Sequence, residues 1–403
     1  MNAPTSDLWP ASRLEALADS HGTPSFVYDG TEIHRRILRV RNAFGADVGL
    51  LYGVKANPLP ALLTSLRDRV DGLDVASEGE VQAALAAGYP PDRLRLAGPA
   101  KTTTLLAEAV DRGITVSVES PDELEELVAL ARRRAQKAFV TLRLEPTTPR
   151  HVFGVAMSGP RRPFGLDRTE TDEALRICAD ADDALSMRGV HVYGGTQCRS
   201  GRGWLAYLAH VLDLAQSVVR RGGSVQEINA GGGFGVETTR GPELNISSIG
   251  PKARSMMAKF PGTPRFVLEL GRFLVADAGV YLARVRCIKI RPGRRIAVLD
   301  GGVHHLWAAT GQLGPTPPIV VTRARPSGRT ELFGPLCTPL DRLGEVDVDL
   351  EQNDLVAFLR SGAYGATMSP SAFLSHPAVK EIWLGQTHSN IRKGDGSQSN
   401  TEP

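Results

Sequence analysis

The chain contains the apolar run Leu50-Leu51-Tyr52-Gly53-Val54, which is followed at once by Lys55-Ala56-Asn57-Pro58. The length and composition of this run predict a buried β-strand with one lysine at its end. A buried ammonium group is costly, so Lys55 either extends to water or loses its charge to a covalent partner. The segment by itself leaves two interpretations open: an ordinary lysine at the mouth of a strand, or a lysine that forms an imine with a carbonyl compound.

This strand pattern recurs along the first two thirds of the chain. Runs rich in Val, Ile and Leu occupy eight stretches, at 48–55, 72–76, 93–97, 115–118, 139–144, 189–193, 225–229 and 266–270. Most of the gaps carry apolar residues at helical spacing, as in Trp204, Tyr207, Leu208 and Val211. Strands that alternate with helices eight times predict an α/β fold, a TIM-like (β/α)8 barrel.

The pattern changes after about residue 275. Strand-like segments with Gly and Pro turns, and little helix between them, predict a C-terminal all-β domain. A strand-like segment at 25–28 precedes the barrel and is expected to pair with that domain. The expected domains are an N-terminal segment joining the β domain (1–30), the barrel (31–275), the β domain (276–386) and a disordered tail (387–403).

Composition argues against several classes of function. The 47 Lys and Arg nearly balance the 44 Asp and Glu, and no basic stripe marks a nucleic-acid partner. The four cysteines lie far apart, which argues against a metal site and against a disulfide scaffold. The sequence has no apolar run long enough to cross a membrane, and its first ten residues lack a signal-peptide pattern. We therefore expect a cytoplasmic protein with no metal and no membrane partner.

Polar side chains gather at the carboxyl ends of the expected strands, where (β/α)8 barrels carry their reactive groups. The seventh strand runs into the loop Gly231-Gly232-Gly233-Phe234-Gly235, and the eighth ends in Glu269 and Arg272. Earlier strand ends supply Lys55, Asp74, Glu119, Arg143, Tyr193 and Thr196. These residues are therefore expected to meet in one polar site at this end of the barrel.

The glycine loop predicts a phosphate site. Successive glycines let backbone amides converge on an anion, and barrels commonly hold a phosphate after the seventh strand. Arg272 supplies a cation for the same phosphate. With Lys55 for an aldehyde and Glu269 for a protonated ring nitrogen, the set indicates pyridoxal 5'-phosphate. The simpler alternatives are an ordinary glycine-rich turn and a surface ion pair between Glu269 and Arg272.

Longer motifs give the chain a family resemblance. They are Tyr-Gly-Val-Lys-Ala-Asn at 52–57, Gly-Leu-Asp-Val-Ala-Ser-Glu-Gly-Glu at 72–80, the loop 231–235, Glu-Leu-Gly-Arg at 269–272, Asp-Gly-Gly at 300–302, Phe-Gly-Pro-Leu-Cys at 333–337 and Ser-Gly-Ala-Tyr-Gly at 361–365. In this combination the chain resembles the fold-type III pyridoxal-phosphate-dependent decarboxylases, the ornithine and diaminopimelate decarboxylase group. The resemblance implies an alanine racemase-like fold and α-decarboxylation of an L-amino acid.

The resemblance also implies roles for single residues. Lys55 binds the cofactor aldehyde, Glu269 stabilises the quinonoid state of the ring, and Cys337 helps to return a proton to the substrate carbon after CO2 leaves. Cys337 is implied to enter the site of a neighbouring subunit, so that a head-to-tail homodimer has two shared sites. Without its motif, Cys337 would be read as an inert thiol. The implied cofactor contacts are Lys55, Asp74, Arg143, Tyr193, Thr196, Gly232, Gly233, Phe234, Gly235, Glu269, Gly271, Arg272 and Tyr364.

The chain departs from the family pattern at positions that face the substrate. Tyr193 stands where relatives stack a histidine on the cofactor, so an aromatic face is kept but a titratable ring is lost. Thr338 stands where an acidic residue normally binds a distal amine. The segment 303–310 lacks the arginine that would bind a distal carboxylate and has Ala308 instead. Neither diaminopimelate nor ornithine therefore finds a charged partner for its far end.

A different substrate is therefore expected. The candidate substrate-binding residues are Thr338, Asp341, His304 and His305. The segments 337–341 and 369–377 look more like a biosynthetic branch of the family. Members of that branch decarboxylate an amino-acid head group on a larger molecule, such as a carrier-protein thioester or a siderophore intermediate.

Three alternatives remain open. One is a meso-diaminopimelate, ornithine or lysine decarboxylase of the same family. A racemase of the same fold is disfavoured by Glu269, because that group resembles a design with arginine at the ring nitrogen. A catalytically inactive, decarboxylase-like regulatory binding protein should have lost part of the site, whereas this chain retains Lys55, the glycine loop, Glu269, Arg272, Cys337 and Tyr364.

Overall fold

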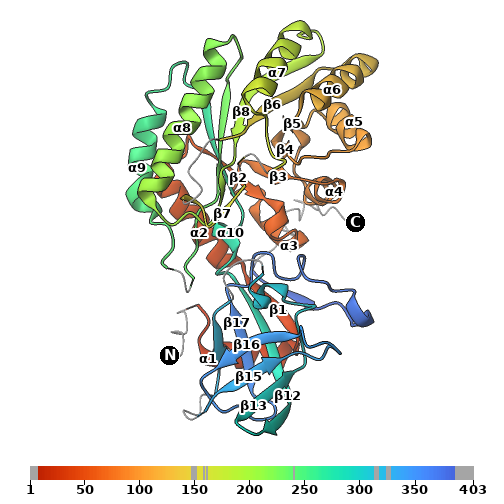
Figure 1. Cartoon of the computed structure of the whole chain (residues 1–403), viewed down its shortest axis with the longest axis vertical. Coiled ribbons are helices and arrows are strands. Elements are labelled where there is room, and N and C mark those ends of the chain that lie inside the picture. The colour runs from red at the N-terminus through yellow and green to blue at the C-terminus, as the bar shows by residue number, and fades with distance from the viewer. Residues whose placement is uncertain are drawn as a thin grey trace, which may run out of the picture.

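The computed structural model describes residues 8–146, 152–157, 159, 162–238, 241–312, 317–323 and 328–385. It shows a barrel packed against a second, mostly β domain (Figure 1). The expected disordered tail at 387–403 lies outside these residues. Within them, no helix is long and apolar enough to cross a membrane.

The barrel is closed by eight parallel strands, as the alternating pattern predicted. In spatial order they are β10 (Glu227–Gly232), β11 (Arg265–Leu270), β2 (Gly49–Gly53), β3 (Gly72–Val75), β4 (Leu94–Leu96), β5 (Thr115–Val118), β6 (Ala138–Leu144) and β8 (Leu185–Val192). Closure between β11 and β2 pairs Leu270 with Tyr52, which brings the eighth barrel strand beside the lysine-bearing first one.

Helices surround the barrel. They are α2 (Gly30–Phe44), α3 (Pro60–Leu66), α4 (Glu78–Ala86), α5 (Thr103–Arg112), α6 (Pro121–Arg134), α7 (Arg168–Asp180), α8 (Gly201–Arg220), α9 (Ile246–Met257) and the short α10 (Arg272–Val275). Local sequence explains where several begin: the side chain of Ser77 accepts a hydrogen bond from the Glu80 amide, and that of Ser120 from the Glu123 amide. Trp204, Tyr207 and Val211 of α8 are fully buried, which confirms the predicted apolar face.

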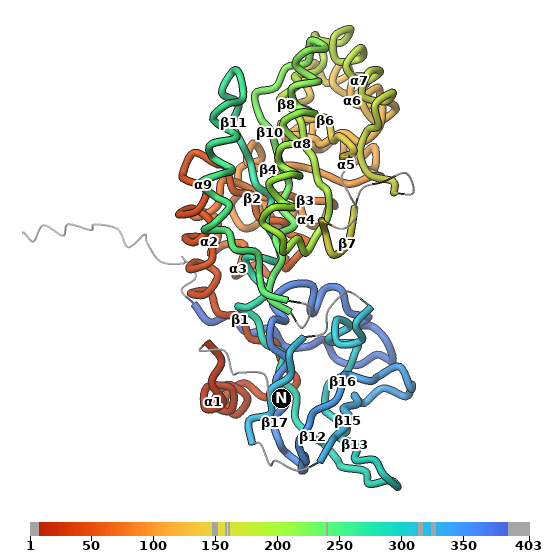
Figure 2. Tube along the Cα trace, turned by 60° about the vertical axis from the view of Figure 1, so that its left-hand side comes forward, coloured from red at the N-terminus to blue at the C-terminus, as the bar shows by residue number. Residues whose placement is uncertain are grey.

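The second domain is an eight-stranded sheet. Its main path runs β14 (Ile319–Val321), β17 (Leu355–Leu359), β12 (Gly279–Arg291), β13 (Arg294–Leu299), β15 (Thr330–Phe333) and β16 (Arg342–Val346). The N-terminal strand β1 (Ser25–Asp29) pairs with β12 and with the last strand, β18 (Lys380–Leu384). Helix α1 (Ala11–His21) contributes Leu14 and Leu17 to a small apolar core that includes Val280 and Leu282 of β12, and it lies beside this sheet in Figure 2.

Short elements complete the described chain. The two-residue strands β7 (Val155–Ala156) and β9 (Gly195–Thr196) pair with each other. Single 3-10 turns occur at η1 (Val54–Ala56), η2 (Pro91–Arg93), η4 (Trp307–Thr310) and η5 (Phe373–Ser375). Lys55 therefore sits on η1, immediately after β2, rather than within the strand itself.

The β domain reaches the barrel mouth through the segment 361–365. The Tyr364 amide donates to the Ala56 carbonyl at 2.8 Å, and the Asn57 side-chain amide donates to the Gly362 carbonyl at 3.1 Å. Tyr364 has a φ of 56°, a left-handed conformation that is rare for an aromatic residue. These contacts hold a strained tyrosine beside the turn that carries Lys55.

We expect a Gly362→Ala substitution to destabilise the protein by about 1–3 kcal/mol, because a Cβ there would collide with the Val275 carbonyl oxygen. Gly79 is the matched control, since a Cβ at that helical position meets nothing closer than Ser77 Oγ at 3.9 Å. Urea unfolding should show a lower midpoint for Gly362→Ala and an unchanged or higher one for Gly79→Ala. Equal midpoints for the two variants would show that the domain junction is not tightly packed.

Candidate active site

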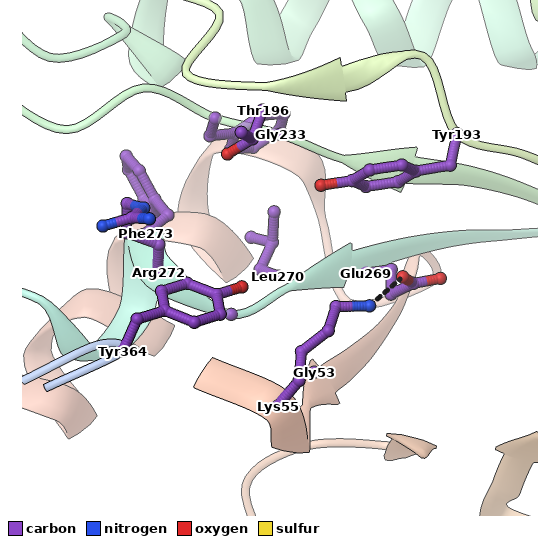
Figure 3. Close-up of a pocket in the computed structure, with 12 residues that line it drawn as sticks. Gly53, Lys55, Tyr193, Thr196, Gly233, Glu269, Leu270, Arg272, Phe273 and Tyr364 are labelled. Carbon is purple, nitrogen blue, oxygen red and sulfur yellow. Dashed lines mark ion pairs between the residues drawn. The ribbon is translucent and has the colours of Figure 1, made fainter. Parts of the chain in front are cut away.

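A pocket lies at the carboxyl ends of the barrel strands and is open to solvent. Figure 3 shows Lys55 and Glu269 together at one end and Arg272 with Tyr364 at the other. The pocket is lined by Gly53, Lys55, Tyr193, Thr196, Gly233, Phe234, Glu269, Leu270, Gly271, Arg272, Phe273 and Tyr364.

Two buried carboxylates hold the Lys55 ammonium group. Its Nζ donates to Asp74 Oδ2 at 2.9 Å and lies 3.8 Å from Glu269 Oε1. Burial would lower the pKa of Lys55, but Asp74 and Glu269 raise it well above its usual value. The side chain is 44% exposed, so the amine remains open to a ligand that enters the pocket.

The two carboxylates differ in their protonation. Burial, and then the nearby Glu269 charge, raise the pKa of Asp74 to about 8. Burial also acts against the charge on Glu269, yet His191 and Lys55 hold the pKa of that carboxyl well below its usual range. Since two close carboxylates in a dry site cannot both ionise cheaply, Glu269 carries the charge and Asp74 keeps a proton near neutral pH.

The opposite end of the pocket is suited to an anion. Arg272 is half-buried, its buried Nε has no hydrogen-bond partner among the described residues, and its guanidinium lies 4.6 Å from the centre of the Tyr364 ring. Burial lowers the pKa of Arg272, so a bound anion would relieve the cost of that desolvated charge. Gly233 cannot carry a side chain, because a Cβ there would collide with the Gly195 carbonyl oxygen. The glycine loop therefore presents backbone without side chains at the end of the pocket where Arg272 lies.

These features fit pyridoxal 5'-phosphate. The unpartnered Arg272 Nε and the glycine backbone suit its phosphate, and Lys55 suits its aldehyde. Glu269 suits a protonated ring nitrogen, and the Tyr193 ring, whose centre is 5.8 Å from Lys55 Nζ, offers an aromatic face at the Lys55 end.

Comparison with known proteins gives the same result. Residues 30–276 match the family model described as the pyridoxal-binding domain of pyridoxal-dependent decarboxylases. The chain belongs to this family. It is 34% identical to the L-glutamyl-[BtrI acyl-carrier protein] decarboxylase of Niallia circulans, over 92% of this chain and 91% of that protein. It is 29% identical to a diaminopimelate decarboxylase of Zymomonas mobilis, over 94% and 92% of the two chains.

A solved structure also matches. A point mutant of the diaminopimelate decarboxylase of Helicobacter pylori, in complex with L-lysine, superposes with a TM-score of 0.83 at 25% identity. The match covers 92% of this chain and 94% of that one. The expectation of a pyridoxal-phosphate-dependent decarboxylase with an alanine racemase-like fold is therefore confirmed.

The structure brings most of the predicted cofactor residues together. Lys55, Tyr193, Thr196, Gly233, Phe234, Glu269, Gly271, Arg272 and Tyr364 all line the pocket. Asp74 lies against Lys55, and Gly232 and Gly235 flank the lining residues of the glycine loop. Arg143 is different, because its Nη1 donates to buried Glu119 at 2.6 Å and it does not line the pocket. Its contact with the cofactor stays a prediction.

The predicted substrate residues lie on the β domain, outside the pocket of the same chain. Cys337 is exposed and Thr338 is half-buried. Asp341 is 1% exposed, and its carboxylate accepts from the amides of Val303 and Leu336, each at 2.7 Å. The geometry thus assigns Asp341 to joining two loops, and a direct contact with substrate stays a prediction.

The two histidines of the specificity segment are buried. His305 lies 3.2 Å from the Tyr281 hydroxyl and 3.3 Å from the Pro377 carbonyl. His304 is fully buried, its ring centre lies 3.8 Å from that of His305 with the two planes tilted by 41°, and neither of its ring nitrogens has a partner among the described residues. Burial lowers the pKa of His304 to about 4, so it is neutral at pH 7. Neither histidine lines the pocket, and their role toward substrate stays a prediction.

Sequence reasoning missed the residues beneath Glu269. The Asn229 side-chain amide donates to Glu269 Oε2 at 3.2 Å, and His191 Nε2 lies 3.2 Å from the same oxygen. One signal was available, because His191 lies two residues before Tyr193 and strand side chains alternate with a period of two. The pairings themselves depend on how neighbouring strands align, which the sequence does not display.

We expect Asp74→Asn to change how stability depends on pH. The folded protein holds a proton on Asp74 up to about pH 8, whereas an unfolded aspartate loses it near pH 4. Between these values the folded state binds the extra proton, so wild-type stability falls as the pH rises. Urea unfolding of the cofactor-free protein at several pH values should show this decline in wild type and a smaller one in Asp74→Asn. Parallel curves would contradict the assigned proton.

Proposed function

We propose that the chain decarboxylates an L-amino-acid head group carried on a larger, thioester-linked molecule, with a glutamyl group as the leading candidate. The observation that carries this proposal is the absence of a charged side chain at Thr338 and Ala308, the positions that would meet the far end of a free diamino acid. A relative that is 34% identical acts on an L-glutamyl group attached to an acyl-carrier protein. A tethered substrate needs no charged partner at its far end.

The pocket residues have separate roles in the proposed reaction. Bound pyridoxal phosphate supplies the electron sink for the bond to the departing carboxylate. In the proposed arrangement Lys55 anchors its aldehyde, and Glu269 keeps its ring nitrogen protonated. Arg272, with the glycine loop, holds the phosphate, while Tyr193 packs against the ring face. These side chains would hold the cofactor and orient the substrate carboxylate for loss of CO2.

The proton that replaces CO2 is assigned to Cys337. It lies on the β domain and is exposed in a single chain. We propose that it enters the pocket of a second copy, and that each site of a homodimer is completed by the partner. The neighbouring loops expose large apolar side chains, which a second copy would cover: Leu340 (67%), Met368 (46%), Phe373 (47%) and Leu374 (49%).

The four free cysteines accord with a reducing cytoplasm as the place of action.

A second candidate substrate is a free diamino acid, because several relatives, including one that is 29% identical, are diaminopimelate decarboxylases. It would require a cation or carboxylate from elsewhere to bind its distal charges.

A CO2-release assay should separate the two substrates. We expect L-glutamyl pantetheine thioester to be decarboxylated with a kcat/KM at least about a hundredfold above that of meso-diaminopimelate, ornithine or lysine, because those lack a partner for their distal charge. Lys55→Ala is the control and should release no CO2 from any of them. Turnover of meso-diaminopimelate as fast as that of the thioester would contradict the proposed substrate, and CO2 release by Lys55→Ala would contradict the role of the lysine.

Mixed dimers test the shared site. Lys55→Ala and Cys337→Ala should each be nearly inactive, but co-expressed subunits should regain roughly a quarter of wild-type activity, because half the dimers are hybrid and each hybrid has one intact site. The control pairs Lys55→Ala with Arg272→Ala, both in the same pocket, and should regain much less. No recovery with Cys337→Ala would show that the cysteine acts within its own chain or not at all.

A further inference from the structure

Four buried polar side chains form one layer inside the barrel, at the end of the pocket that Glu269 lines. They are Asp74 on β3, Ser117 on β5, His191 on β8 and Glu269 on β11, each at most 6% exposed. These are the second, fourth, sixth and eighth strands of the barrel in chain order. A layer of four side chains from alternate strands is the normal way to fill such a barrel, but branched apolar residues usually supply it. A polar layer at this depth is costly unless its members bind one another.

The layer is joined by contacts that converge on Glu269. Ser117 Oγ lies 2.8 Å from His191 Nδ1, and His191 Nε2 lies 3.2 Å from Glu269 Oε2. The second contact has ion-pair distance without the alignment of a hydrogen bond. Strand register sets this geometry, because His191 is aligned with Asn229 on β10, whose side-chain amide donates to the same Glu269 oxygen.

Ser117 Oγ can donate to His191 Nδ1 or accept from it, and the charge on Glu269 favours a proton on Nε2, the ring nitrogen that lies nearer to it. When the hydroxyl donates to Nδ1, the proton of a neutral imidazole is on Nε2, which lies 3.2 Å from Glu269 Oε2. If the ring is fully protonated, Nδ1 donates to Ser117 Oγ instead, and Nε2 still presents a proton to Glu269. Either form favours a charged Glu269, in agreement with the lowered pKa of that carboxyl.

We propose that His191 is a positioning residue of the decarboxylation reaction, which with Ser117 fixes the orientation and the negative charge of Glu269 at the cofactor ring nitrogen. This inference rests on the proposed role of Glu269. Without His191, Glu269 would lie beside buried Asp74 with one donor fewer, and it would take up a proton or turn toward Lys55. A neutral Glu269 cannot keep the ring nitrogen protonated, so the cofactor would bind more weakly and absorb differently.

Cofactor binding to the apoprotein, without substrate, tests the inference. We expect the Kd for pyridoxal phosphate to rise about 10- to 100-fold in His191→Leu, which keeps the volume and loses the donor. His191→Gln retains an N–H group and should recover most of the affinity. Ser117→Ala should fall between wild type and His191→Leu. The matched control is His210→Leu, on α8 and outside the pocket lining, which should bind like wild type.

Two further measurements separate positioning from packing. In His191→Leu the absorption spectrum of the bound cofactor should change with pH over a range where wild type is constant. The double variant His191→Leu/Glu269→Gln should bind no more weakly than Glu269→Gln, since His191 acts through Glu269. Thermal unfolding and circular dichroism identify a variant that fails to fold. If His191→Leu fails, the cofactor affinity and spectrum of His191→Gln are compared with those of wild type instead.

Three results would overturn the inference: wild-type affinity with a pH-independent spectrum in His191→Leu, equal losses in His191→Leu and His191→Gln, or additive losses in the double variant. If the proposed role of Glu269 itself is wrong, Glu269→Gln will bind the cofactor like wild type. This result distinguishes that failure from a failure of the role of His191. Failure of the proposed decarboxylation would appear in the CO2 assay, while the binding results remained as predicted.

Discussion

The Lys55 ammonium group lies against two buried carboxyl groups, of which Glu269 carries the charge, and the rest of the site depends on this arrangement. Its Nζ is 2.9 Å from Asp74 Oδ2 and 3.8 Å from Glu269 Oε1. Two carboxylates so close in a dry interior repel each other, and the pair is tolerated because Lys55 and His191 supply compensating contacts while Asp74 keeps a proton. Barrel closure is what brings them together, since β11 pairs with β2 and β2 with β3.

The β domain makes the barrel mouth into a pocket. Its segment 361–365 is hydrogen-bonded to the turn after Lys55, and it delivers Tyr364 beside Arg272. The first strand of the chain, β1, binds two strands of this domain, so the sheet is completed by both ends of the described chain. Cys337 also lies on the β domain, exposed and outside the pocket of its own chain, as its proposed entry into the pocket of a second copy requires.

The sequence supports the prediction of the barrel, the β domain and most of the cofactor pocket, because strand ends and glycine loops have local patterns. Lys55, the glycine loop, Glu269 and Arg272 could be found this way, since each terminates a recognisable strand. Contacts between distant strands could not. The pairing of Arg143 with Glu119, and the two backbone amides that Asp341 accepts from, are such contacts, while the predicted roles of both residues toward cofactor and substrate stay predictions. Both sets of contacts depend on which buried polar groups lie close enough to bind one another. The alignment of distant segments in the folded protein decides this, and the sequence does not display it.

The most direct test of the central claim is to locate the covalent attachment of the cofactor. Borohydride reduction of the protein with bound pyridoxal phosphate, followed by proteolysis and mass spectrometry, identifies the modified lysine. The geometry predicts one modification per chain, on Lys55. Lys101, in the loop between β4 and α5, is the informative comparison, because its side chain is also buried but is paired with Glu123 at 2.8 Å. Attachment at Lys101 or at any other lysine, with Lys55 unmodified, would contradict the proposed site.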